Sequence, residues 1–104
     1  MTLANPPFSV IKSHRGGIFV QKYYVYMLRC NDGSLYCGYT PDPQKRLDLH
    51  NKGVASRYTR ARLPVEMVFL MEFDSKSEAL KTEYTIKHLS KKEKETLVRE
   101  NGII

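Results

Sequence analysis

The sequence predicts an α+β fold in which a small three-stranded antiparallel sheet is flanked by helices. Two runs of aromatic and β-branched residues surround an Asn-Asp-Gly turn and predict a hairpin. A later segment alternates with the period of a strand, and two capping boxes mark the starts of further helices. The predicted order of elements is therefore β-β-α-β-α-α.

The hairpin is predicted over residues 23–39, and its register depends on the length of its loop. A two-residue loop would place Tyr26 and Tyr36 on opposite faces of the sheet. A three-residue loop with Gly33 at positive φ would pair Leu28 with Tyr36 and place both tyrosines on one face. The Asn-Asp-Gly sequence favours the three-residue loop.

One helix and one further strand are predicted after the hairpin. Asp42 is a good helix cap and Pro43 suits the first helical position, so a helix is predicted over residues 43–52. The basic segment 53–64 is predicted to be a loop, and residues 65–73 are predicted to form the third strand. One face of that strand would carry Val65, Met67, Phe69, Met71 and Phe73.

Two capping boxes predict the last two helices. Ser75 with Glu78, and Ser90 with Glu93, have the spacing that a reciprocal cap requires. The second of these helices is predicted over residues 91–100. The first helix carries apolar residues at helical spacing, which we expect on its packed face: Ala79, Leu80, Tyr84 and Ile86.

A chain of 104 residues supports one hydrophobic core, which we place in a domain over residues 23–100. Residues 1–22 contain prolines, glycines and no acidic residue, and are expected to form a flexible basic arm, while residues 101–104 form a short tail. The arm has no long apolar stretch of the kind found in signal peptides, and no segment is long enough to span a membrane. We therefore expect a cytoplasmic protein.

The net charge of +6 is unevenly distributed along the chain. Residues 1–65 hold ten Lys and Arg against three Asp, a balance of +7, whereas residues 66–104 have a balance of −1. Such a field suits a phosphate backbone, although a solvated basic surface is an open alternative. Between residues 45 and 62, Asp48 is opposed by Lys45, Arg46, Lys52, Arg57, Arg60 and Arg62.

The two cysteines, Cys30 and Cys37, lack the spacing of a metal or redox motif and are too few for a disulfide scaffold. Reduced thiols are expected. Because both lie on the predicted hairpin, a cross-strand disulfide or half of a metal site stays open.

Several polar residues could carry chemistry together. Arg46 and His50 lie one helical turn apart, so both could face Tyr26 and Tyr36. An Arg there can neutralise charge developing on a phosphate, and a His can position a reacting oxygen. The alternative is that the tyrosines only pack and that the Arg–His pair is an exposed pair beside Asp48.

Glu83 is predicted to lie within an apolar face of its helix. A carboxylate in such a place needs a cation, because burying an unpaired charge is costly. Either a bound metal or an ion pair with Arg46 would satisfy it.

The order and spacing of these residues resemble the GIY-YIG nuclease superfamily, in particular its small single-domain bacterial members. Residues 24–26 (Tyr-Val-Tyr) stand in the place of the GIY triplet and residues 36–38 (Tyr-Cys-Gly) in that of the YIG triplet, with Tyr24 replacing a Gly and Cys37 an Ile. The resemblance covers residues 23–99. The later helical residues of the family are matched by Arg46, His50 and Glu83.

The resemblance implies hydrolysis of a phosphodiester with one divalent cation, Mg²⁺ or Mn²⁺, held chiefly by Glu83. Arg46 would offset charge on the phosphate, and Tyr26 would activate the attacking water with help from Tyr36 and His50. A free phenol has a pKa near 10, so a tyrosinate base implies an alkaline optimum. Segments like 57–62 and 87–92 occur in those members, which extends the expected nucleic-acid contacts to Lys45, Lys52, Arg57, Tyr58, Arg60, Arg62 and Lys87.

The expected function is that of a metal-dependent endonuclease acting on nucleic acid, on DNA in preference to RNA, and structure-directed or weakly specific because the domain is small. A separate protein partner could supply specificity, and the oligomeric state is unknown from sequence. Two alternatives stay open: a nucleic-acid-binding module with a slow or silent site, and a protein-interaction module tethered by its arm.

Overall fold

The fold is built on three antiparallel strands in the order β2-β1-β3, which confirms the predicted α+β class. The computed structural model describes residues 21–101, so the predicted arm and tail lie outside it except for Gln21, Lys22 and Asn101. The strands are β1 (Tyr23–Arg29), β2 (Leu35–Thr40) and β3 (Glu66–Phe73).

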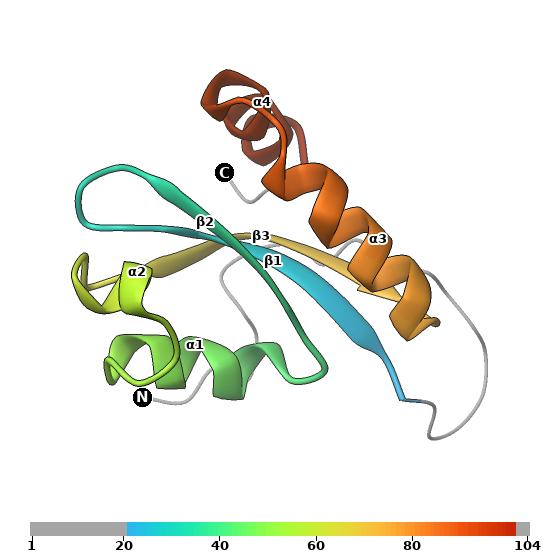
Figure 1. Cartoon of the computed structure of the whole chain (residues 1–104), viewed down its shortest axis with the longest axis horizontal. Helices are drawn as coiled ribbons and strands as arrows, with labels where there is room; N and C mark the ends of the chain where they lie inside the picture. The colour runs from blue at the N-terminus through green and yellow to red at the C-terminus, as the bar shows by residue number, and fades with distance from the viewer. Residues whose placement is uncertain (1–20, 102–104) are drawn as a thin grey trace.

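Four helices cover the two faces of this sheet. Figure 1 shows α1 and α2 on one face and α3 and α4 on the other. None of the helices in the described part has the length and apolar character needed to cross a bilayer. The helices are α1 (Pro43–Asn51), α2 (Arg57–Arg60), α3 (Lys76–Lys87) and α4 (Lys91–Asn101).

The helix α2 corrects the prediction that residues 53–64 are only a loop. Ser56 caps this short helix, since its side chain accepts a hydrogen bond from the backbone N–H of Thr59 at 3.2 Å. A four-residue helix has no stable form of its own, so it depends on the side chains that it packs against the sheet. Its buried residue is Thr59.

The hairpin has the three-residue loop that the sequence favours. The backbone N–H of Cys30 donates to the carbonyl oxygen of Ser34 at 2.9 Å, and Gly33 has a φ of +86°. Leu28 therefore pairs with Tyr36, and Tyr26 pairs with Gly38. These two pairs are two positions apart, so Tyr26 and Tyr36 lie on the same face of the sheet, as predicted.

The third strand departs from the strict alternation that was predicted. Its pairing with β1 shifts between Met27 and Leu28, which leaves Val68 as an extra residue. Because of this bulge, Val65 and Met67 pack with α1, whereas Phe69 and Met71 pack on the opposite side of the sheet. The prediction that all five apolar residues share one face was wrong.

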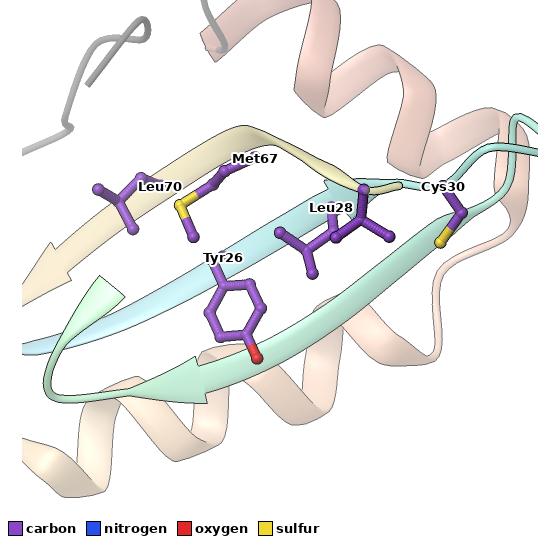
Figure 2. Close-up of a cluster of buried hydrophobic side chains, with 6 residues drawn as sticks. Tyr26, Leu28, Cys30, Met67 and Leu70 are labelled. Atoms are coloured by element: carbon purple, nitrogen blue, oxygen red, sulfur yellow. The ribbon is translucent and has the colours of Figure 1, made fainter. Parts of the chain in front are cut away.

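Two hydrophobic clusters follow from this arrangement, one on each face. On the α1 face, Tyr26, Leu28 and Met67 pack beneath Leu47 of α1. Figure 2 shows that the Tyr26 ring extends from β1 towards β2, with its hydroxyl at the neighbouring strand. On the α3 face the buried residues are Val25, Met27, Cys37, Phe69, Ala79 and Ile86.

Both predicted capping boxes start helices where expected. Ser75 accepts from the N–H of Glu78 at 3.2 Å, and Ser90 and Glu93 exchange two hydrogen bonds of 2.9 and 3.1 Å. The packed face of α3 is narrower than predicted. Ala79 and Ile86 are buried, but Leu80 and Tyr84 are 40% and 66% exposed.

The helix α4 is fixed to the hairpin by a charge cluster. Arg29 of β1 binds both carboxylate oxygens of Glu95, and Lys91 donates to the same carboxylate at 2.9 Å. The hydrogen bond from Arg29 is the main reason that the pKa of Glu95 falls to about 2. This pairing holds α4 beside the end of β2 that begins at Leu35.

Candidate active site

A chain of hydrogen bonds begins at the buried Tyr26 and runs through α1 to α2. The Tyr26 hydroxyl lies 2.8 Å from Nε2 of His50, and Nδ1 of His50 lies 2.8 Å from the hydroxyl of Thr59. Tyr26, His50 and Thr59 are 2%, 1% and 0% exposed. His50 is therefore not the exposed partner of Asp48 that one reading of the sequence allowed, and Tyr26 does not have a solvated hydroxyl.

The direction of these hydrogen bonds follows from the partner of Thr59. Its hydroxyl donates to the carbonyl oxygen of Ser56 at 3.4 Å, which leaves its lone pairs to accept from Nδ1, and on this ground we assign the Nδ1–H tautomer to His50. Nε2 is then the acceptor for the hydroxyl of Tyr26. Burial, and then the charge of Arg46, lower the pKa of His50 to about 4, so the imidazole is neutral at physiological pH.

The position of Tyr26 depends on a glycine in the neighbouring strand. A Cβ placed on Gly38 would lie 2.5 Å from the Tyr26 hydroxyl and 2.6 Å from the ring carbon that carries it. Only a residue without a side chain allows the ring to cross β2 here. The Tyr26 hydroxyl consequently reaches β2, which pairs with β1 on one side and forms an edge of the described sheet.

Burial, followed by the neighbouring Tyr36, raises the pKa of Tyr26 above its ordinary value, while Arg46 acts in the opposite direction. This shift opposes the one that a free tyrosinate base requires. The alkaline optimum stays a prediction for a free tyrosinate base, and the hydrogen bond to His50 offers a second route for the proton.

Two further aromatic rings and one guanidinium group lie beside this hydrogen-bonded pair. The ring of Tyr36 meets the edge of His50 at a centroid distance of 5.2 Å and lies 6.5 Å from the ring of Tyr26. Tyr58 of α2 stacks on Tyr36 at 6.0 Å, with an angle of 24° between the rings. Arg62 covers Tyr58 at 3.8 Å. Residues from β1, β2, α1 and α2 thus form one packed cluster.

Arg46 lies on α1, one turn before His50, and its charge acts on both Tyr26 and His50. Its buried Nε atom has no hydrogen-bond partner among the described residues. Beside it lies a depression of about 330 Å³ lined by Thr40, Asp42 and Lys45. A guanidinium with an unused donor at a cationic depression is suited to an anionic oxygen.

Glu83 approaches the same strand edge from the α3 face. Its side chain is 19% exposed and forms an ion pair of 3.3 Å with Lys87, one turn further along α3. The alternative partner named from the sequence, Arg46, is not paired with it among the described residues. The charge of Glu83 adds to the raised pKa values of both Tyr26 and Cys37, which burial mainly causes. Glu83 is therefore within electrostatic range of Tyr26, across the edge of β2.

The residues present fit a single divalent cation that is bound by one carboxylate and otherwise by water and phosphate oxygens. No group of three or more His, Cys, Asp or Glu side chains gathers within residues 21–101. Magnesium is commonly bound by one or two carboxylates, with water and phosphate oxygens completing its shell. Glu83, partly exposed and neutralised only by the lysine of its own helix, has lone pairs available for such an ion.

The residues predicted to bind nucleic acid fall into two groups. Tyr58, Arg62 and Lys87 lie next to the tyrosine cluster, and Lys45 lies next to Arg46. Arg62 is also fixed by Asp32, whose carboxylate accepts from its Nε at 3.0 Å. The remaining three, Lys52, Arg57 and Arg60, are exposed around α2.

Lys22, assigned from the sequence to the flexible arm, forms ion pairs with Glu72 and Asp74 at the end of β3. Glu72 also accepts a hydrogen bond of 3.2 Å from Tyr24, the residue that replaces the family's glycine. This corner of the sheet is thus held by charge at the opposite end of β1 from Arg29.

The cysteines are free and buried, as expected for reduced thiols. Cys30 packs on the α1 face and Cys37 on the α3 face, so no cross-strand disulfide joins them. Burial chiefly raises the pKa of the Cys37 thiol to about 12. A neutral thiol of this kind acts as a small apolar side chain.

Thr59 is the buried member of this hydrogen-bonded chain that sequence reasoning missed. A threonine in a basic loop gives no signal of burial by itself. The available signal is Ser56, because serine is a favoured helix cap and predicts a short helix after it. Thr59, three residues after this cap, then points inward. Gly38 was recognised only as part of a triplet, without its contact to Tyr26.

Another surface depression, of about 750 Å³, lies on the outer side of α3. It is lined by Leu80, Tyr84 and four polar residues of the same helix, and contains none of the predicted catalytic side chains. The cluster at β2 is the better candidate, because polar groups from five elements converge there with shifted pKa values.

Comparisons with known proteins agree on one family. The family model described as the GIY-YIG catalytic domain matches residues 22–96. A UPF0213 protein of Staphylococcus saprophyticus is 48% identical over 81 residues, which cover 78% of this chain and 99% of that protein. A UPF0213 protein of Bacillus licheniformis is 50% identical over 78 residues, which cover 75% and 80%.

A solved relative has the same architecture. The solution structure of a UPF0213 protein from Bacillus halodurans is 47% identical and superposes with a TM-score of 0.54, over 78% of this chain and 86% of that one. These relatives carry a family name that states no reaction.

Proposed function

The chain belongs to the GIY-YIG catalytic-domain family, and from this premise we propose that it is a metal-dependent endonuclease that hydrolyses phosphodiester bonds in nucleic acid, preferentially DNA. The observation that carries the proposal is the convergence of Tyr26, His50 and Arg46 on one side of the β2 edge with Glu83 on the other. Ordinary packing does not require four ionisable groups at one strand edge.

The proposed base is Tyr26 acting together with His50. As the Tyr26 oxygen accepts a proton from the attacking water, its own proton passes to Nε2 of His50 along the existing hydrogen bond of 2.8 Å. The water oxygen bonds to phosphorus, and the bond from phosphorus to the leaving oxygen breaks. Thr59 keeps the imidazole in the tautomer that can accept the proton.

Both groups are neutral before substrate enters, because burial opposes the charged forms of Tyr26 and His50. The negative charge of a bound phosphate would favour the imidazolium that forms on His50. Arg46, whose charge already acts on Tyr26 and His50, would offset the charge that grows on the non-bridging oxygens. Tyr36, packed against the His50 ring, orients the water.

A divalent cation, Mg²⁺ or Mn²⁺, would be held by Glu83 and would stabilise the leaving oxygen. Lys87 is the competitor for that carboxylate, since it lies 3.3 Å from it. We expect Lys87 to turn to a substrate phosphate when a cation binds. Its position one helical turn from Glu83 allows both arrangements.

The test compares Glu83→Gln with the wild type on labelled DNA and RNA at several Mg²⁺ and Mn²⁺ concentrations. Cleavage should be lost at every metal concentration, while binding should be largely kept, because phosphate contacts elsewhere supply affinity. Glu78→Gln is the matched control, an exposed carboxylate in the first turn of the same helix, and should cut normally. Equal loss of cutting and binding would assign Glu83 a structural role.

One observation favours a second candidate function, a binding module with a silent site. The Glu83–Lys87 ion pair neutralises the carboxylate without any metal. The same assay decides between the two, because a silent site would bind both substrates and cut neither at any metal concentration.

We also place this activity in the cytoplasm and in the domain over residues 23–100. The arm over residues 1–22 would add phosphate contacts, or a partner protein would supply specificity. Removing residues 1–20 from the chain and measuring binding would separate these roles, since only the first predicts weaker binding by the isolated protein.

A further inference from the structure

A second depression, of about 330 Å³, lies beside the tyrosine cluster and crosses the edge of β2. Its floor comes from Leu35 and Cys37, which point to the α3 face of the strand, and from Tyr36, which points to the other. Its volume is at the lower end of the range for small-molecule pockets, roughly 300–1,000 Å³. It is too small for a helix or a strand pair and suits one flat ring system. Its lining consists of Leu35, Tyr36, Cys37, Tyr58, Lys87 and Lys94.

One wall of this pocket is aromatic and held in place. Tyr58 stacks on Tyr36, and the guanidinium of Arg62 lies 3.8 Å from the centre of the Tyr58 ring. Arg62 also donates to the carbonyl oxygen of Tyr58 at 2.9 Å and to Asp32 of the hairpin loop. Tyr58 is nevertheless 38% exposed. Because Tyr36 and Arg62 already lie against the ring, a ligand would pack on the part of Tyr58 that is left exposed, and a ring fixed in this way loses little entropy on binding.

The opposite wall is cationic. Lys87 of α3 and Lys94 of α4 line it, and the charges of both act on the Cys37 thiol at the floor. Lys94 forms no ion pair with any acidic side chain of residues 21–101, so its charge is not used within the described structure. The pocket thus combines an apolar floor, an aromatic wall and two ammonium groups, and these complement a ring that carries phosphates.

The pocket adjoins the proposed reaction centre on both sides. Tyr36 belongs to the pocket and also contacts the ring of His50 at 5.2 Å. Lys87 belongs to the pocket and also pairs with Glu83 at 3.3 Å. A ligand in the pocket would therefore lie next to the group that Tyr26, His50 and Glu83 act upon.

We propose that this pocket binds one unpaired nucleobase of the substrate, next to the phosphate that is cut, with Lys87 and Lys94 on its flanking phosphates. The proposal rests on the nuclease function and names its substrate class. Both faces of a base inside a duplex are covered by its neighbours, so only an unpaired or extruded base has a face to offer to an aromatic wall. Nucleic acid with an unpaired nucleotide at the cut is the preferred substrate.

The test measures base stacking without chemistry. The full chain, with divalent cations removed by EDTA, is titrated into single-stranded DNA that carries 2-aminopurine, whose fluorescence falls when it stacks. Tyr58→Leu keeps apolar bulk and removes the aromatic face, whereas Tyr58→Phe keeps the face. We expect quenching with the wild type and with Tyr58→Phe. For Tyr58→Leu we expect little quenching and affinity weaker by roughly 5- to 100-fold.

A duplex of the same sequence is the matched substrate control. On it, Tyr58→Leu should bind within about twofold of the wild type, because phosphate contacts alone remain. Lys94→Gln should weaken binding to the single strand, and thermal unfolding of each variant verifies the fold.

Two outcomes would overturn the pocket. In the first, Tyr58→Leu binds the single strand as tightly as the wild type while Lys94→Gln binds it more weakly, so that phosphate contacts account for the binding. In the second, the wild type binds the duplex more tightly than the single strand. These outcomes are independent of the nuclease function. If the protein stacks the base but does not cut with metal, the pocket stands and the nuclease function is wrong. If it cuts duplex DNA and Tyr58→Leu has no effect, the nuclease function stands and the pocket is wrong.

Discussion

At the scale of single residues, the polarity of the Tyr26–His50–Thr59 chain decides what each group can do. Thr59 accepts from Nδ1, so Nε2 is free to take a proton from Tyr26. The imidazole can accept because burial keeps it neutral. In the proposed reaction Thr59 would be a positioning residue, acting only through His50.

Replacing Thr59 by Val should reveal this role. The substitution keeps the shape but removes the acceptor for Nδ1, so the wrong tautomer of His50 becomes available. We expect kcat to fall by roughly 10- to 100-fold, with KM within about twofold, since substrate contacts are unchanged. Thr59→Ser keeps the hydroxyl and should restore most of kcat. A Thr59→Val enzyme with normal kcat would show that the tautomer does not matter.

The pH profile separates a His50-assisted base from a free tyrosinate. His50 has a pKa of about 4 in the folded protein, so we expect kcat to be level from roughly pH 6 to 9 and to fall at lower pH as the imidazole is protonated. A rise of about tenfold per pH unit across that range would assign the base to ionised Tyr26 instead.

The same group links folding to pH. Because its pKa is 6.5 when unperturbed and about 4 when folded, the unfolded chain binds this proton first. Its contribution to stability is complete above pH 6.5 and declines as the pH falls towards 4. Thermal unfolding at several pH values would detect this decline, and His50→Gln should remove it.

Sequence reasoning grouped the residues proposed to react but did not predict their surroundings. Tyr26, Tyr36, Arg46 and His50 could be grouped because helix and strand periods place them on faces that meet. The pairing of Glu83 with Lys87 rather than with a helix across the sheet depends on side-chain rotamers, which no periodicity reports. The burial of Thr59 depends on α2, which is too short to produce a periodic pattern of apolar residues.

At the scale of elements, β2 makes room for the Tyr26 ring because one of its residues has no side chain. Gly38 lies opposite Tyr26 and lets the ring of β1 cross the neighbouring strand. The hairpin loop fixes this pairing, because a loop one residue shorter would turn Tyr26 and Tyr36 to opposite faces. The turn chemistry at Gly33 therefore determines which face of the sheet Tyr26 and Tyr36 share.

Gly38→Ala tests this contact. A methyl group 2.5 Å from the Tyr26 hydroxyl must displace the ring and break its hydrogen bond to His50. We expect kcat to fall at least about tenfold, and the free energy of unfolding to fall by about 1–3 kcal/mol from overpacking. Rate measurements and urea unfolding together would show it. Wild-type kcat in this variant would mean that the Tyr26 position is not fixed by the glycine.

The elements that could be predicted are those with strong local chemistry. Both capping boxes and the Asn-Asp-Gly loop define their own boundaries, and the structure confirms them. The bulge at Val68 could not be predicted, because it arises from pairing between β1 and β3, which are distant in sequence. The exposure of Leu80 and Tyr84 likewise depends on how α3 is rotated against the sheet.

At the scale of the whole molecule, charge is arranged around one region. Arg62, which follows α2, lies against the tyrosine cluster, and Lys87 and Lys94 reach its other side from α3 and α4. This agrees with the positive balance of residues 1–65 and with a phosphate-bearing partner.

The salt dependence of binding should report this surface. Each neutralised phosphate contributes about −0.7 to −0.9 to the slope of log affinity against log salt concentration. Arg57→Gln, at the start of α2, should reduce the slope by about that amount. Lys81→Gln is the control, because Lys81 lies on the outer side of α3, and its slope should equal that of the wild type. Equal effects of the two variants would contradict a localised contact surface.

The open edge of β2 also limits how the molecule can associate with itself. A strand from a second copy that extended the sheet at β2 would lie beside Tyr26 and Tyr36, two of the side chains proposed to act in catalysis. Sheet extension and the proposed catalysis would then exclude each other on this edge. Exposed strand edges elsewhere are shielded by charge or bulges, whereas here bound nucleic acid itself would act as the shield, and the free protein would be the form at risk of aggregating.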